Sequence, residues 1–281
     1  MLKLRSARVR CAAAASILAV FLAAALQAQG STVGQSGSAT DDALLAKAAT
    51  MYYSTAKAGM MGFDCAVHPD WRTLFTSDGQ GAAVSDNDSR VILLNGVAIT
   101  LHARMKGGST LDWNPASGGA TDADSTALLK GMREATEQRL VQGFLEFWTP
   151  FVDGEAIPAS SSGLTLTHGP STLTLHRVSN GTDVTEVFSN GLMLEKYDVI
   201  MGSTSIKFEP SYNPTAQGLL VGSFLGHMRQ LGSPPAPDQD IRVSIEYQAI
   251  QGLPIPKQLN VEVVGAWIFN MSLDGCTVIR H

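Results

Sequence analysis

Residues 241–263 read IRVSIEYQAIQGLPIPKQLNVEV, and this stretch decides the class of fold. Ile241–Tyr247 alternates apolar with polar residues, and Leu259–Val263 repeats the alternation after an intervening turn. A period of two places every second side chain on the same face of a β-strand. Two such segments joined by a short connection predict an antiparallel hairpin with one apolar and one polar face.

The same period extends outward from this hairpin through most of the chain. Apolar residues separated by Thr, Glu or Lys recur at Leu164, Leu166, Leu173, Leu175, Val184, Leu192, Leu194, Ile206 and Phe208, and again from 267 to 273. Asn-Gly favours a tight hairpin turn, because both central residues of a type I′ turn need positive φ. Such turns are predicted at Asn95-Gly96, Asn180-Gly181, Asn190-Gly191 and Asp274-Gly275. We therefore expect about ten strands in an antiparallel meander, which twist makes curl.

A long helix is predicted over Ala123–Val152, between the first strands and the meander. Its first half is amphipathic, and its second half, Leu140–Val152, is apolar nearly all round. Such a helix is buried on every side, or buried on one side and facing a ligand on the other. Two interpretations stay open: a helix sandwiched between sheet and loops, or one whose Phe144, Trp148 and Phe151 line an apolar cavity.

The N-terminus carries a targeting pattern. Met1–Arg10 has four basic residues and no acid, Cys11–Leu26 is almost continuously apolar, and Gln27-Ala28-Gln29-Gly30 follows as the exit from the apolar run. This order predicts a secretory signal peptide over residues 1–28. The apolar run is shorter than the roughly 20 residues that span a bilayer, although an uncleaved anchor is the alternative. We expect a periplasmic or secreted protein.

The remaining chain is interpreted as a flexible leader and one domain. Residues 29–40 are small and polar, and a helix is predicted from Asp41 after the N-capping Thr40. Residues 41–281 then form a single domain. Gly-rich Lys106–Gly119 and Pro-rich Ser233–Asp238 are predicted to be long loops.

The charge of the exported chain excludes one class of partner. Cleavage after Ala28 removes four of the 20 Lys and Arg and none of the 25 Asp and Glu, which leaves a formal charge of −9. Nucleic-acid binding requires clustered basic residues that neutralise phosphates, and a polybasic membrane contact requires the same. The chain after Ala28 has no such cluster, so nucleic acid is not expected as a partner.

Two cysteines, Cys65 and Cys276, remain after cleavage. In an oxidising compartment disulfides persist, and a bridge between them would stabilise the fold by closing a very long loop. The alternative is a pair of buried free thiols that behave as small apolar residues. We favour the disulfide.

Motifs for catalysis or metal binding are missing from the sequence. It has no zinc-protease helix motif, nucleophile elbow, phosphate-binding loop or dinucleotide fingerprint. Asp86–Arg90 and Asp122–Asp124 begin like calcium loops but lack the glycine and the closing glutamate. His168 and His176 can meet in one hairpin, but two histidines without a third ligand favour a surface role. We expect no catalytic residue, metal or cofactor; a hydrolase with scattered carboxylates is a lesser alternative.

The order of elements and the segment Ile245–Val261 resemble a known superfamily. A Tyr-bearing strand, a Gly-Leu-Pro-x-Pro-Lys turn and a return strand are typical of the periplasmic lipoprotein carriers of LolA and LolB type, which include the sensor RseB. The layout is also similar to that of secreted bacterial proteins with a cysteine near each end. The resemblance implies an unclosed β half-barrel with helices on its concave side and an apolar cavity for acyl chains. It carries over no catalytic residue.

Together these patterns predict an α+β monomer: a curved antiparallel half-barrel of about ten strands wrapped around two main helices. The predicted function is non-catalytic binding of a lipid or an acylated protein. The predicted cavity residues are Leu140, Phe144, Trp148, Phe151, Trp267 and Phe269. The alternative is a cell-envelope sensor or scaffold that binds a protein partner through a sheet edge or loops.

Overall fold

The computed structural model describes residues 39–281 except 78–83, 117–121, 155, 180 and 232–237. The predicted signal peptide, most of the leader and most of the Pro-rich loop lie outside the described residues. No helix within the described part of the chain is long and apolar enough to cross a membrane.

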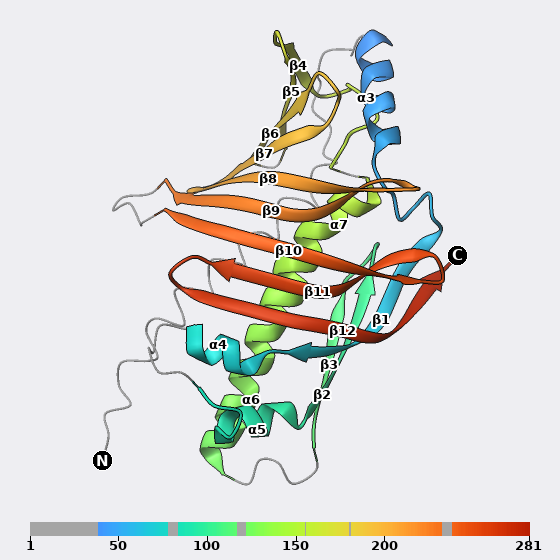
Figure 1. Cartoon of the computed structure of the whole chain (residues 1–281). Coiled ribbons are helices and arrows are strands. Elements are labelled where there is room, and N and C mark those ends of the chain that lie inside the picture. The colour runs from blue at the N-terminus through green and yellow to red at the C-terminus, as the bar shows by residue number, and fades with distance from the viewer. Residues whose placement is uncertain (1–38, 78–83, 117–121, 155, 180, 232–237) are drawn as a thin grey trace.

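One open antiparallel sheet of twelve strands dominates the fold (Figure 1). In chain order the strands are β1 Met60–Pro69, β2 Val97–Arg104, β3 Thr110–Pro115, β4 Thr165–His168, β5 Thr172–Ser179, β6 Thr182–Ser189, β7 Leu194–Met201, β8 Thr204–Thr215, β9 Gly218–Gln230, β10 Gln239–Ile250, β11 Leu253–Val263 and β12 Trp267–Arg280. The meander runs in sequence from β4 to β12, and β1 then pairs with β12. Because β3 and β4 stay at opposite edges, the sheet does not close.

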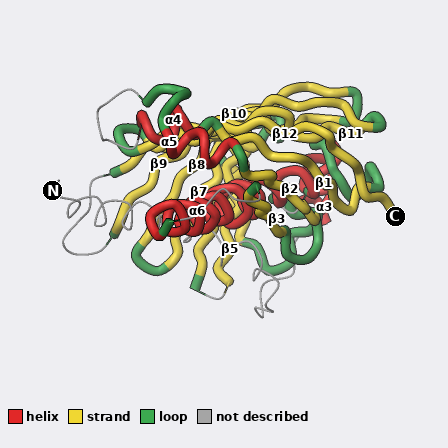
Figure 2. The backbone as a smooth tube through the Cα atoms, turned by 90° about the horizontal axis from the view of Figure 1, so that it is seen from below, coloured by secondary structure: helices red, strands yellow, loops and turns green. Residues whose placement is uncertain are grey.

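Helices complete the fold, and the strands bend around the long helical stretch at Ala123–Asp153 (Figure 2). The helices are α3 Ala39–Met51, α4 Trp71–Ser77, α5 Ser89–Asn95, α6 Ala123–Thr136, the π-helix η2 Glu137–Leu145 and α7 Glu146–Asp153. The last three follow one another without a break, so we call Ala123–Asp153 the rod. Asp122 caps its start by accepting a hydrogen bond from the Ser125 amide. The predicted α+β class with a curved antiparallel sheet is confirmed.

The strand count and two turns were predicted wrongly. There are twelve strands instead of about ten, partly because β3 forms inside the stretch expected to be a Gly-rich loop. Asn95-Gly96 ends helix α5 instead of turning a hairpin. Asp274-Gly275 lies within β12 at a register shift, where Gly275 has φ +57°. Residues that tolerate positive φ end helices and form bulges as readily as they form turns, and local sequence does not separate these uses.

The predicted disulfide between Cys65 and Cys276 is present. Cys65 lies on β1 and Cys276 on β12, so the bond joins two neighbouring strands from opposite ends of the chain. It fastens the block of β1 to β3 onto the C-terminal end of the meander.

Candidate functional site

The six predicted cavity residues are all buried, in the seam between the rod and the concave face of the sheet. Leu140, Trp148 and Phe269 have no exposed surface, and Phe144, the most exposed, retains 6%. Leu140, Phe144, Trp148 and Phe151 come from the rod, where spacings of three or four residues place them on the same side, toward the sheet. The two remaining residues, Trp267 and Phe269, come from β12.

Trp148 is held on several sides at the middle of the seam. Its ring stacks on Phe144 with centroids 5.8 Å apart, and Phe63 of β1 meets it edge-on at 6.3 Å. Its indole Nε1 donates a 2.9 Å hydrogen bond to the Tyr247 hydroxyl, which in turn donates to the Val221 carbonyl at 2.6 Å. Trp148 therefore ties the rod to strands β9 and β10.

Phe151 belongs to a second aromatic group nearer the end of the rod. Its ring lies 5.4 Å from Tyr197 of β7 and 5.0 Å from Phe224 of β9. Phe147 joins the same group, 4.2 Å from Phe208 and 4.6 Å from Phe224. Sequence reasoning missed Phe147, although its three-residue spacing from Phe144 indicated the same face of the helix.

Trp267 and Phe269 contact the rod through a cation. The Arg139 guanidinium carbon lies 4.8 Å from the Trp267 ring centre and 5.5 Å from that of Phe269. Arg139 was also missed, because a charged residue in an apolar helix offers no pattern that predicts a ring partner. These two aromatic residues therefore line the seam beside Arg139.

A narrow slot interrupts the packing between rod and sheet. It holds about 30 Å³ and is lined by Arg139, Gly143, Phe144, Phe147, Phe208, Ile241, Val243 and Val261. That volume suits about one water molecule. Of the six predicted residues, Phe144 alone lines this slot.

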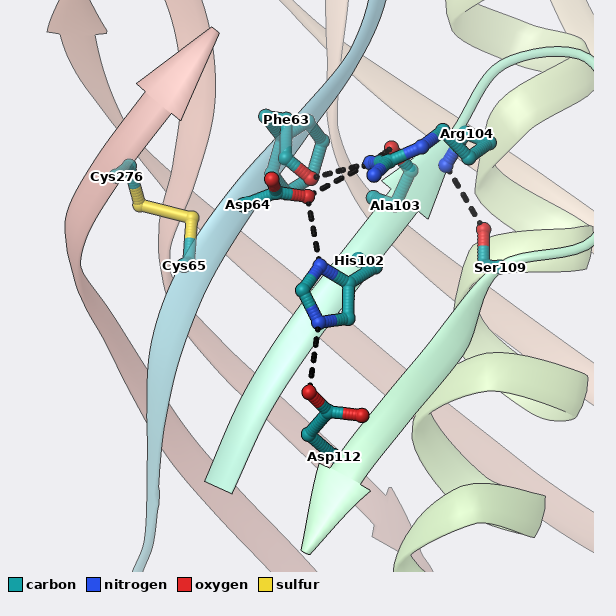
Figure 3. A network of polar contacts seen from close by, with 9 residues as sticks. All are labelled: Phe63, Asp64, Cys65, His102, Ala103, Arg104, Ser109, Asp112 and Cys276. Carbon is teal, nitrogen blue, oxygen red and sulfur yellow. Dashed lines mark hydrogen bonds and ion pairs between the residues drawn. A yellow bond between two sulfur atoms is a disulfide. The ribbon is translucent and has the colours of Figure 1, made fainter. Parts of the chain in front are cut away.

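A polar network lies apart from the seam, on strands β1, β2 and β3 (Figure 3). His102 Nδ1 lies 3.0 Å from Asp64 Oδ1, and Nε2 lies 3.2 Å from Asp112 Oδ2. Arg104 Nη1 donates to the same Asp64 oxygen at 2.7 Å. The hydrogen bonds to Asp64 and then Asp112 raise the pKa of His102. With both nitrogens engaged by carboxylates, the ring has no nitrogen left to accept a substrate proton.

The other paired histidines also contact aspartate. His227 lies between Asp240 at 2.8 Å and Asp238 at 3.2 Å. His68, His168 and His176 each lie 2.9–3.1 Å from one carboxylate. In the part of the chain that the structure describes, no group of three or more His, Cys, Asp or Glu is arranged to hold a metal ion.

One carboxylate points into the apolar side of the sheet. Glu186 is 1% exposed and alternates with the buried Val184 and Phe188 along β6. Burial raises its pKa to about 7, and Arg177, whose Nη2 lies 3.0 Å from Glu186 Oε1, lowers it in part. The alternation of β6 was a signal that places Glu186 inside, but its burial there was not predicted.

Neither a family model nor a curated protein matches this chain.

Proposed function

We propose that this protein is an exported, non-catalytic binding protein that holds an acyl chain of a lipid or acylated protein between the rod and the sheet. The observation that carries the proposal is the apolar seam, which reaches the surface at the slot beside Gly143. The disulfide supports export to an oxidising compartment, in line with the signal peptide predicted for residues 1–28.

The size of the slot requires the rod to move when ligand binds. Ligand pockets usually hold about 300–1,000 Å³, ten or more times the volume of the slot. A chain of about 14 methylenes gains roughly 11 kcal/mol on burial, at about 0.8 kcal/mol per CH₂. That free energy offsets the loss of apolar contacts between rod and sheet, because the ligand makes new apolar contacts with both.

The part of the rod beside the slot is the part best suited to move. Residues Glu137–Leu145 form a π-helix, a form that is rare and often found at functional sites. Gly143 lies within it, and glycine in a helix costs about 1 kcal/mol relative to alanine. Arg139 lines the same slot and supplies a positive charge for an anionic head group.

The two histidines held between carboxylates lie outside the slot, which favours binding over catalysis by these histidines. His102 and His227 are each held between two carboxylates. General acid–base catalysis needs a titratable group within hydrogen-bond reach of the substrate. Neither histidine lines the slot.

Fluorescence titration with anthracene-labelled stearate tests this proposal. The wild-type protein should bind the probe, and Gly143→Leu should weaken binding at least roughly tenfold, because its side chain fills the slot. Gly131→Leu is the matched control: Gly131 is exposed on the same rod, and a β-carbon there meets no atom within 4 Å. Wild-type protein that ignores the probe, or Gly143→Leu that binds as well as Gly131→Leu, would overturn the proposal.

A further inference from the structure

The sheet splits between β9 and β10. These strands pair from Gln239–Ser244 with Ser223–Met228, and beyond Ser244 they diverge, β9 remaining with β8 and β10 with β11 (Figure 1). The two hairpin ends enclose an open groove of about 590 Å³. Its walls include Gln217 and Leu220 on one side and Glu246, Tyr247 and Ala249 on the other. This volume lies within the range of ligand-binding pockets.

The main chain of β10 points into this groove. Tyr247 and Ala249 lie opposite Pro256 and Pro254 of β11. Opposite residues of antiparallel strands form either a hydrogen-bonded pair, in which each N–H donates to the other residue's carbonyl, or a non-hydrogen-bonded pair. Proline has no N–H, so these two pairs are of the second kind. The N–H and C=O groups of Tyr247 and Ala249 therefore face away from β11, toward the split. Within the described residues, these main-chain groups have no hydrogen-bond partner.

The opposite wall shows the same geometry, but there the chain supplies the partners. Leu219 lies opposite Pro214 of β8, so its carbonyl also faces the split. That carbonyl accepts a hydrogen bond from the Tyr53 amide at 2.9 Å. The Val221 carbonyl, two residues along, accepts from the Tyr247 hydroxyl at 2.6 Å. Two carbonyls of the β9 wall thus have partners within the chain, whereas the main-chain groups of Tyr247 and Ala249 on the β10 wall do not.

We propose that the groove binds an extended segment of a partner protein that carries basic side chains, and that this segment adds to β10 as an extra strand. An unpaired strand edge presents alternating donors and acceptors, which an extended backbone matches. The groove is therefore a specific candidate site for the alternative function, in which a protein partner binds at the edge of a strand. It does not depend on the proposed acyl-chain site.

The charge of the groove lining favours a basic ligand. Glu246 is exposed in the lining, and no lining residue is Lys, Arg or His. Basic side chains on the incoming strand would lie near this carboxylate. A second copy of the chain, pairing β10 with β10 about a twofold axis, would instead bring two Glu246 carboxylates together, which is unfavourable. A basic segment of a different protein therefore fits better than self-association.

Fluorescence anisotropy with a labelled peptide of sequence Lys-Val-Lys-Val-Lys-Val tests the proposal on the intact exported chain. We expect saturable one-to-one binding that weakens with salt. The same peptide N-methylated at alternate residues keeps its side chains but loses its donors, so it should bind at least roughly tenfold more weakly. The acidic analogue Glu-Val-Glu-Val-Glu-Val should also bind weakly.

Two variants report on the protein side. Glu246→Lys should weaken binding of the basic peptide at least roughly tenfold and improve binding of the acidic one. Glu195→Lys makes the same charge change at an exposed position of β7 outside the groove lining, and should bind like wild type. Ala249→Pro removes a main-chain N–H that faces the groove and none that pairs with β11. This variant should therefore fold, as circular dichroism would show, and should lose binding of the basic peptide.

Three results would overturn the proposal: no binding of the basic peptide by wild type, equal binding of its N-methylated form, or equal loss in Glu195→Lys and Glu246→Lys. A wild-type dimer that Ala249→Pro dissociates would assign the groove to a second copy instead. The outcome is separable from that of the acyl-chain site, because Gly143→Leu should leave peptide binding unchanged, and Glu246→Lys should leave stearate binding unchanged.

Discussion

Removing the disulfide should cost this protein a large part of its stability. The perturbation is the double substitution Cys65→Ala/Cys276→Ala. The two residues are 211 positions apart, and the chain-entropy model assigns a closed loop of that length about 5 kcal/mol at 25 °C. Total stabilities of native proteins are about 5–15 kcal/mol, so the bond accounts for a substantial fraction.

Two features of the structure favour a loss near that value. Cys65 and Cys276 join adjacent strands, so the bond constrains a contact that the unfolded chain must otherwise find across almost its whole length. Cys65 is 1% exposed, and alanine at this site adds only a small packing loss. For a domain of this size, about 5 kcal/mol corresponds to a fall in Tm of roughly 10–20 °C.

Urea unfolding followed by tryptophan fluorescence measures the difference. The double variant should lose several kcal/mol, reduced wild type should match it, and reductant should leave the variant unchanged. A loss below about 1 kcal/mol would refute the reasoning, because β1 and β12 would then be held in place without help from the bond.

The remaining predictions concern buried groups and backbone. Burial raises the pKa of Glu186 from 4.5 to about 7, so the folded state retains a proton that the unfolded state has lost. This group's contribution to stability therefore falls by about 3 kcal/mol as pH rises from 4.5 through 7. Glu186→Gln should flatten that part of the urea-derived stability profile between pH 4.5 and 8; an unchanged slope would contradict it. Trp148→Phe removes the donor to the Tyr247 hydroxyl and should cost about 2 kcal/mol in urea unfolding, whereas a cost near zero would show that the hydrogen bond is replaced. Gly218 has φ +119°, and a β-carbon there would lie 2.8 Å from main-chain atoms of Met51, Tyr52 and Tyr53 at the end of α3, so Gly218→Ala should cost at least about 2 kcal/mol. Gly181→Ala, at φ +79° with open space, is the control and should cost less; equal melting temperatures would rule out the steric term.

The candidate sites show the limits of prediction from local pattern. Burial of the second half of the rod was predictable, because a helix without a polar face must bury itself. The volume beside it was not, since packing leaves gaps that depend on side chains from four or more elements at once. The alternation of β6 placed Glu186 inside, but the contact of Arg139 with Trp267 and Phe269 joins two distant segments and could not be predicted from either one.

The sequence alone determined the antiparallel α+β architecture and the long helix with its apolar second half, and it favoured a bond between the two cysteines. Each follows from a period of two, a period of 3.6 or the chemistry of a residue type, all of which are local properties. Only the tertiary structure decided that β1 pairs with β12 and that β9 and β10 diverge after Ser244. It also decided that the packing between rod and sheet leaves a gap of only about 30 Å³. These features depend on strand register and packing between residues far apart in the chain, where the free energy of the whole fold selects among contacts that local sequence permits equally.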